Sequence, residues 1–230
     1  MNTSNSTSHS NIATEQMTRL GQQIEHESFA VVDQEAGEHA YTAEQWPVVR
    51  RMIHATADFE FNGLTQFHPE AIAAGVNAIL QGKALIADVE MICVGVSKPR
   101  LAHFGVTLHQ FISDDDVIND AKAADSTRAV FAMRKAHKLG LLDGAIIGIG
   151  NAPTALLEIL RLVREENAKP ALIIGMPVGF VSAAESKELL AECSTVPWII
   201  THGRKGGSTL VVAAIHAILA LAENAQRAQS

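Results

Sequence analysis

Residues 145–175 read AIIGIGNAPTALLEILRLVREENAKPALIIG, and this stretch decides the fold. It opens with an apolar run, Ala145–Ile149, continues as an amphipathic segment over 154–166 and closes with a second apolar run, Ala171–Ile174. Short apolar runs bounded by turn residues are typical of strands buried on both faces, and Pro153 suits the first turn of a helix. The stretch therefore predicts two parallel strands joined by a helix.

The same alternation extends in both directions from this unit. Further apolar runs predict strands at residues 84–87, 106–111 and 198–201. Helical patterns predict further helices at 14–27, 42–57, 69–81, 125–138, 182–193 and 208–224. The predicted fold class is α/β, a single domain with a mostly parallel sheet covered by helices on both faces. We expect this domain to occupy residues 13–230 and the polar residues 1–12 to form a disordered tail.

The composition argues against several classes of protein. Hydrophobic residues make up 47% of the 230 residues and charged residues 19%, unlike a disordered chain. The net charge of −7 argues against a broad nucleic-acid-binding face. Cys93 and Cys193 are too few for a disulfide framework, and residues 1–11 lack the apolar core of a signal peptide. The apolar segment Leu210–Ala222 is too short to span a bilayer, so we expect a cytoplasmic protein without a membrane partner.

Loops that follow parallel strands are where ligands of such sheets bind. The loop GRKGGS, residues 203–208, combines flexible glycines, two basic side chains and the start of a helix, which favours binding of an anion. The alternative is a tight turn whose basic residues face water. The segment 148–153 begins like a dinucleotide fingerprint, but Pro153 stands where the third glycine belongs, which disfavours a nicotinamide site.

Two further segments carry candidate functional side chains. Ser182 and Glu185 predict a capping box, and Phe180 just before them belongs either to the core or to a surface that packs on a flat ligand. His54 is expected near the end of the helix that opens with a capping box at Thr42, where the helix dipole favours positive charge. No spacing of histidines and cysteines resembles a metal site.

Four blocks, in order along the chain, resemble one family. They are RMIHATADF (51–59), GNAPTAL (150–156), PVGFV (177–181) with ESK (185–187), and GRKGGS (203–208). Together they are similar to segments of the precorrin-8X methylmutases of cobalamin biosynthesis. The resemblance implies an isomerase that moves a methyl group between adjacent carbons at pyrrole ring C of precorrin-8X or cobalt-precorrin-8, giving hydrogenobyrinate or cobyrinate. It also implies a homodimer with the site near the subunit boundary, and no separate cofactor.

The resemblance assigns roles to individual residues. His54 matches the family histidine thought to protonate the macrocycle and assist the methyl shift. The residues expected to bind the tetrapyrrole substrate and corrin product are Ser28, Arg51, Asp88, Met91, Gly95, Arg128, Asn151, Arg204, Lys205 and Ser208. The basic members suit the acetate and propionate groups that fringe such a ring.

Three positions depart from the family pattern. Other residues are frequent in the family where this chain has Glu90, Ala129 and His216.

Two alternative functions stay open. The first alternative is a non-catalytic tetrapyrrole-binding or carrier protein. The second is a nucleotide-dependent enzyme that uses the glycine loops for phosphate. The sequence leaves open whether the substrate carries cobalt and whether the product is handed to the next pathway enzyme.

Overall fold

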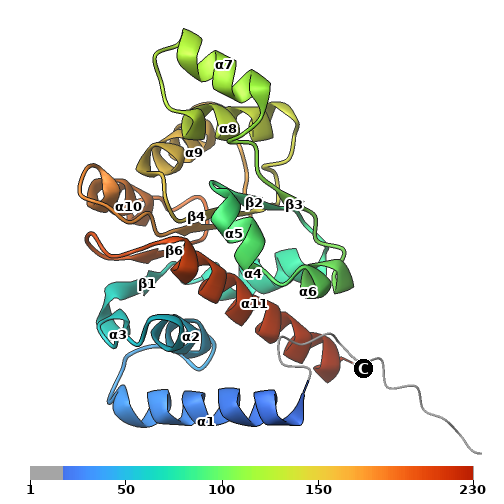
Figure 1. Ribbon diagram of the computed structural model, residues 1–230, viewed down its shortest axis with the longest axis vertical. Helices are drawn as coiled ribbons and strands as arrows, with labels where there is room; N and C mark the ends of the chain where they lie inside the picture. Colours follow the sequence, from blue (N-terminus) through green and yellow to red (C-terminus); the bar gives the residue numbers. More distant parts are fainter. Residues whose placement is uncertain (1–17, 230) are drawn as a thin grey trace, which may run out of the picture.

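The computed structural model describes residues 18–229, and its centre is a six-stranded sheet (Figure 1). The strand order is β1-β6-β5-β4-β2-β3. β1 pairs antiparallel with β6, whereas every other neighbouring pair is parallel. The strands are β1 (Thr65–Phe67), β2 (Leu85–Ala87), β3 (Leu108–His109), β4 (Ile146–Ile149), β5 (Leu172–Gly175) and β6 (Trp198–Thr201).

The predicted mostly parallel sheet is confirmed, with differences at its two edges. Every residue of β2, β4, β5 and β6 is buried, which explains their continuous apolar sequences. The strand expected at 106–111 shrinks to Leu108–His109. β1 was not predicted, because its three residues become a strand only through antiparallel pairing with β6.

Helices cover both faces of the sheet (Figure 1). One face carries α2 (Trp46–Thr56), α4 (Ala71–Leu80) and α11 (Ser208–Ala228). The other carries α8 (Arg128–Lys138), α9 (Pro153–Glu165) and α10 (Ala183–Ala191). The remaining helices are α1 (Arg19–Glu35), α3 (Phe61–Leu64), α5 (Glu90–Gly95), α6 (Lys98–His103) and α7 (Asp115–Ala123). Cys93 and Cys193 are buried and unbridged.

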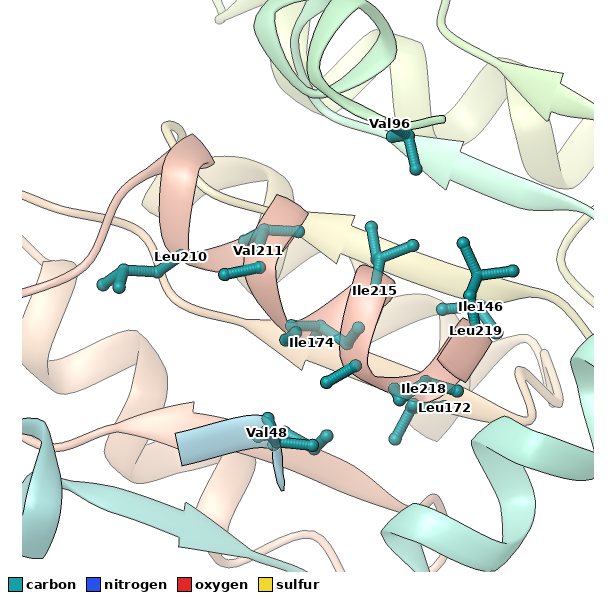
Figure 2. Close-up of a cluster of buried hydrophobic side chains, with 14 of the residues drawn as sticks. Val48, Val96, Ile146, Leu172, Ile174, Leu210, Val211, Ile215, Ile218 and Leu219 are labelled. Carbon is teal, nitrogen blue, oxygen red and sulfur yellow. The ribbon is translucent and has the colours of Figure 1, made fainter. Parts of the chain in front are cut away.

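The longest helix, α11, runs through the larger of the two hydrophobic clusters. Figure 2 shows Val211, Ile215 and Ile218 among apolar side chains from the sheet and from α2. The helix has 21 residues, so the expectation that this apolar segment is too short to span a bilayer is wrong on length. Its length and composition alone would allow it to cross a membrane, yet it packs against α2, α4 and α5 as a core helix.

The N-terminal helices differ from expectation in their bounds. The predicted tail, residues 1–12, lies outside the described residues. The first helix continues to Glu35 rather than stopping at 27, so Ser28 and Phe29 are helical. Thr42 and Gln45 do form the reciprocal capping box: each backbone N–H donates to the other's side chain, at 3.1 and 3.2 Å. α2 itself begins one residue after this box, at Trp46.

The predicted capping box at Ser182 is wrong. Ser182 has φ 61°, in the left-handed region, and within the described residues its hydroxyl caps no N–H of α10. A capping serine needs an extended backbone to turn its side chain back onto the helix. The short helices α3, α5 and α6 and the longer α7 were also not predicted. The first three have one or two turns each, too few to show a helical period.

Candidate active site

Three loops meet at the edge of the sheet where β4, β5 and β6 end. Backbone hydrogen bonds join them in sequence. The Val178 N–H donates to the Gly150 carbonyl at 3.4 Å, and the Gly179 N–H donates to the Arg204 carbonyl at 3.3 Å. The Gly207 N–H donates to the Met176 carbonyl at 2.8 Å. The loops therefore form one connected surface at the edge where parallel sheets bind their ligands.

Two glycines in these loops are required by loop-to-loop packing. A Cβ on Gly150 would lie 2.6 Å from the Cα of Ser208, and one on Gly206 would collide with the carbonyl oxygen of Met176. Non-bonded heavy atoms cannot approach each other as closely as in these two contacts. These glycines thus allow two backbones to approach each other, whereas the sequence analysis explains the glycines of the 203–208 loop by the approach of an anion.

Asp88, which follows β2, holds the loop after β4. One carboxylate oxygen accepts the N–H of Gly150 at 3.1 Å, and the other accepts those of Asn151 and Ala152, both at 2.8 Å. The side chain is fully buried. Burial raises the pKa of this carboxyl, and the three N–H donors oppose that rise. Asp88 is predicted to contact substrate, and in the structure its carboxylate holds the loop after β4.

This contact also bears on the nucleotide alternative. In the strand order, β2 lies between β3 and β4, so the strands that follow β2 in the chain are added first on one side of it and then on the other. In parallel sheets, a ligand-binding crevice typically opens at such a reversal of strand order. In a dinucleotide site, the backbone N–H groups of this loop would receive a phosphate. In this chain the Asp88 carboxylate already accepts the N–H groups of Gly150, Asn151 and Ala152. The loop that resembles a dinucleotide fingerprint is therefore filled by the protein itself.

A buried lysine on α10 anchors the glycine loop after β6 by a hydrogen bond. Lys187 on α10 is 1% exposed, and its ammonium donates to the Lys205 carbonyl at 2.7 Å and to the Thr201 hydroxyl at 3.4 Å. The Thr201 hydroxyl donates to the same carbonyl at 2.7 Å. Burial lowers the pKa of Lys187 to about 8. Sequence reasoning gave Lys187 no role, although it lies in one of the quoted family blocks.

His54 lies in the last turn of α2 and is exposed. The helix stops at Ala57, which adopts the left-handed conformation at φ 52°. The imidazole meets the Phe29 ring of α1 edge-on, with ring centroids 5.1 Å apart. Arg51 lies over the same phenyl ring and pairs with Glu25 of α1 at 3.1 Å. The aromatic contact thus orients His54 while leaving it open to solvent.

The segment that follows His54 is tied to the glycine loop by an ion pair. Lys205 lies 2.5 Å from Asp58 and 3.1 Å from Glu60. These carboxylates raise the pKa of Lys205, and Lys205 lowers the pKa of Asp58. A cleft of about 490 Å³ lies between the two segments, lined by Ala55, Thr56, Asp58, Phe61, Val178, Lys205, Gly206, Gly207, Thr209 and Leu210. Lys205, expected to bind substrate, is already neutralised by these two carboxylates.

A second, more apolar hollow lies beside this cleft. It measures about 460 Å³ and is lined by Met91, Val94, Gly95, Thr209 and Val212. Thr209 lines both hollows, so the two lie next to each other at the first turn of α11. Met91 and Val94 are 67% and 72% exposed, so two apolar side chains of this hollow face solvent.

Phe180 belongs to the surface and not to the core. It is 84% exposed on the loop after β5, and the Arg204 guanidinium lies over its ring at 5.6 Å from the centroid. Arg204 is itself exposed. The pair presents a flat apolar face next to a cation, which suits a flat ligand with carboxylate arms.

The other predicted site residues lie on different elements and do not form one cluster. Arg128 and Asn151 are exposed near the loop after β4, where the neighbouring Thr127 and Thr154 hydroxyls lie 2.9 Å apart. Ser208 is buried at the start of α11. The Ser28 hydroxyl donates to the Ile24 carbonyl within α1 at 2.8 Å. Among residues 18–229 no hydrogen bond or ion pair joins Arg128 or Asn151 to His54.

The three departures from the family pattern are accommodated locally. The Nε2 atom of His216 accepts the backbone N–H of Ser97 at 3.0 Å, which links α11 to the turn between α5 and α6. Glu90 is exposed at the start of α5, and Ala129 is buried in α8. None of the three touches the His54 imidazole through a contact that the described part of the chain shows.

A larger hollow, of about 600 Å³, lies elsewhere, between α7, α8 and α9. Ion-paired side chains line it, among them Lys135 with Asp116 and Arg161 with Glu166. It contains none of the predicted site residues. In the described part of the chain, no group of three or more histidine, cysteine or acidic side chains could hold a metal ion.

Comparisons with known proteins point to one family. The family model described as precorrin-8X methylmutase matches residues 23–221. A cobalt-precorrin-8 methylmutase of Leptospira interrogans is 51% identical over 90% of this chain and 96% of its own. One of Priestia megaterium is 54% identical over 90% and 91% of the two chains. A crystal structure of the precorrin-8X methylmutase of Thermus thermophilus superposes with a TM-score of 0.83 at 51% identity, covering 89% of this chain and 97% of the other.

Proposed function

Because the chain belongs to the precorrin-8X methylmutase family, the isomerases of this name in cobalamin biosynthesis, we propose that it moves a methyl group at pyrrole ring C of its tetrapyrrole with His54 as general acid. The observation that carries this proposal is the position of His54. It is an exposed imidazole at the end of α2, and the residues directly after it line the cleft beside the glycine loop.

The chemistry requires a proton donor and little else from the protein. The methyl group breaks its bond to one ring carbon and forms a bond to the neighbouring carbon, so substrate and product are isomers. Protonation of the conjugated macrocycle withdraws electrons and lowers the barrier to this migration. Histidine changes charge near neutral pH, which suits a group that gives and recovers one proton per turnover.

Exposed groups near His54 support the binding of a large flat substrate. The cleft next to residues 55–58 continues into the apolar hollow at Met91, and the combined surface is broad rather than deep. We assign the ring faces to apolar side chains such as Met91 and Phe180, and one carboxylate arm to Arg204. We do not assign a substrate carboxylate to Lys205, because Asp58 and Glu60 already neutralise its charge.

We further propose the cobalt-bearing form as the natural substrate. The curated relatives of 51% and 54% identity are both named for cobalt-precorrin-8. The name of the similar Thermus thermophilus structure specifies precorrin-8X, so the metal-free compound is the proper comparison in any assay.

The test is anaerobic incubation of the purified protein with cobalt-precorrin-8 and, separately, with precorrin-8X. We expect the visible spectrum to change to that of the corrin, faster with the cobalt form. Binding of either compound without any spectral change, by a folded protein, would favour the carrier alternative. Faster conversion of the metal-free compound would contradict the substrate assignment alone.

The assembly and its setting are part of the same proposal. We propose a cytoplasmic homodimer in which the site lies near the subunit boundary, with transfer of the corrin product to the next pathway enzyme. Exposed apolar residues on α1, including Leu20 and Ile24, and on the loop after β5 offer surface for such contacts. Sedimentation velocity should give the mass of two chains, and a single-chain mass at micromolar concentration would contradict the dimer.

A further inference from the structure

Lys187 combines deep burial with the absence of an acidic partner. Its side chain is among the largest fully buried ones, and within residues 18–229 no carboxylate pairs with it. Its two acceptors are a backbone carbonyl and a hydroxyl oxygen. Burying an ammonium group without a counter-charge costs several kcal/mol, and a methionine of similar length would fill the same space without that cost. Fold stability alone therefore does not explain a lysine at this position.

The carbonyl that Lys187 holds lies at the centre of the glycine loop. It belongs to Lys205, between Arg204 and Gly206. A trans peptide places its N–H on the edge opposite its carbonyl. With the Lys205 carbonyl drawn toward Lys187, the Gly206 N–H is directed away from Lys187, and Gly206 lines the 490 Å³ cleft.

The same residue connects the loop to the segment after His54. Lys187 and Thr201 hold the backbone carbonyl of Lys205. The side-chain ammonium group of Lys205 binds Asp58 and Glu60. Asp58 is four residues beyond His54 and directly follows Ala57, where α2 ends. A shift of the Lys205 backbone would therefore move both the neighbouring Arg204 and the anchor of this segment.

We propose that Lys187 is a positioning residue for the methyl transfer, which fixes the Lys205 carbonyl and thereby holds Arg204 and the segment after His54 in their working arrangement. The inference rests on the proposed function. It assigns the lysine an effect on catalysis that exceeds its effect on folding, and it predicts that the two effects can be separated.

The experiment compares wild type with Lys187→Met in two measurements. The first is amide hydrogen exchange at Gly207 and Gly179, whose N–H groups bond across the loops. We expect exchange there to become at least about ten-fold faster. The second is turnover of the tetrapyrrole: kcat/KM should fall by about ten-fold, while Tm stays equal or rises.

Ser186→Ala is the matched control. Ser186 is the buried neighbour of Lys187 on α10, and its hydroxyl donates to the Ala183 carbonyl within the helix at 3.1 Å. It should leave loop exchange and kcat/KM unchanged. Thr201→Val removes the second donor to the Lys205 carbonyl and should accelerate the same amides to a smaller extent.

The two measurements separate the possible failures. Unchanged exchange at Gly207 and Gly179 in Lys187→Met would overturn the inference whether or not the protein turns over substrate. Unchanged kcat/KM beside an active wild type would overturn it as well. An inactive wild type would instead contradict the proposed function, and the exchange measurement would still decide whether Lys187 holds the loop.

Discussion

Two loops at the same edge of the sheet are held by opposite buried charges. The loop after β4 is held by Asp88, a buried anion that accepts three backbone N–H groups. The loop after β6 is held by Lys187, a buried cation that donates to one backbone carbonyl. Each charge matches the backbone group that its loop leaves unpaired, because a carboxylate only accepts hydrogen bonds and an ammonium group only donates them.

The consequences for the two loops differ. Three N–H groups of the first loop point inward to Asp88, so they are not available to an external anion. In the second loop a carbonyl points inward, and Arg204 next to it remains exposed. The buried anion thus engages the N–H groups of the first loop, whereas the buried cation leaves Arg204 of the second loop exposed. Variants that remove each buried charge test this difference directly.

The largest effect on stability is expected for Asp88→Ala. It leaves three buried N–H groups without their acceptor, each of which costs about 1–3 kcal/mol. We expect the free energy of unfolding to fall by about 3 kcal/mol or more, measured by urea denaturation. A loss below about 1 kcal/mol would mean that water or another group readily replaces the carboxylate.

Removal of the opposite charge should change stability in a pH-dependent way. The pKa of Lys187 is lowered to about 8, whereas a lysine in the unfolded chain titrates near 10.5. Between these values the unfolded chain binds more protons, so stability from this group rises with pH in that window. Lys187→Met should therefore be more stable than wild type at pH 7, by at most about 3.5 kcal/mol, since one pKa unit is about 1.4 kcal/mol.

This advantage of Lys187→Met should shrink as the pH rises from 8 to 10.5. Subtracting the two unfolding curves removes the titration of groups common to both proteins. The only groups with which the ammonium hydrogen-bonds, among residues 18–229, are Thr201 and the Lys205 carbonyl, and neither titrates in this window. A constant difference across the window would contradict burial of a charged lysine.

Arg204→Ala should act on binding rather than on folding. An exposed arginine that binds a carboxylate contributes about 1.5–3 kcal/mol, so tetrapyrrole affinity should fall about ten- to hundred-fold in a fluorescence or absorbance titration. The free energy of unfolding should change by less than about 0.5 kcal/mol. Arg164→Ala, an exposed arginine in the last turn of α9, is the control and should alter neither quantity. Unchanged affinity in Arg204→Ala would make Arg204 a solvent-facing turn residue.

Much of the fold could be predicted because its elements carry local patterns. Strands β2, β4, β5 and β6 are apolar throughout, and helix α9 opens with a proline and has a clear apolar face. β1 could not be predicted, since three residues acquire strand geometry only from β6, more than 130 residues later. The short helices α3, α5 and α6 have too few turns to show a helical period.

The site could be predicted in outline for a related reason. Parallel strands place the loops that follow them at one edge, so the glycine loop and the loop after β4 were expected there. Burial of Asp88 and the partners of Lys187 depend on which backbone group each meets in three dimensions. The pairing of Lys205 with Asp58 spans 147 positions of sequence, and no local pattern reveals it.

The most direct test of the proposed mechanism is turnover and binding by His54→Ala beside wild type. Wild type should convert cobalt-precorrin-8 to the corrin, as followed by the visible spectrum. His54→Ala should bind the compound with affinity close to that of wild type and convert it about 10²–10⁴-fold more slowly, the contribution of a positioned acid. Conversion by His54→Ala at the wild-type rate would contradict the assignment of His54 as the acid.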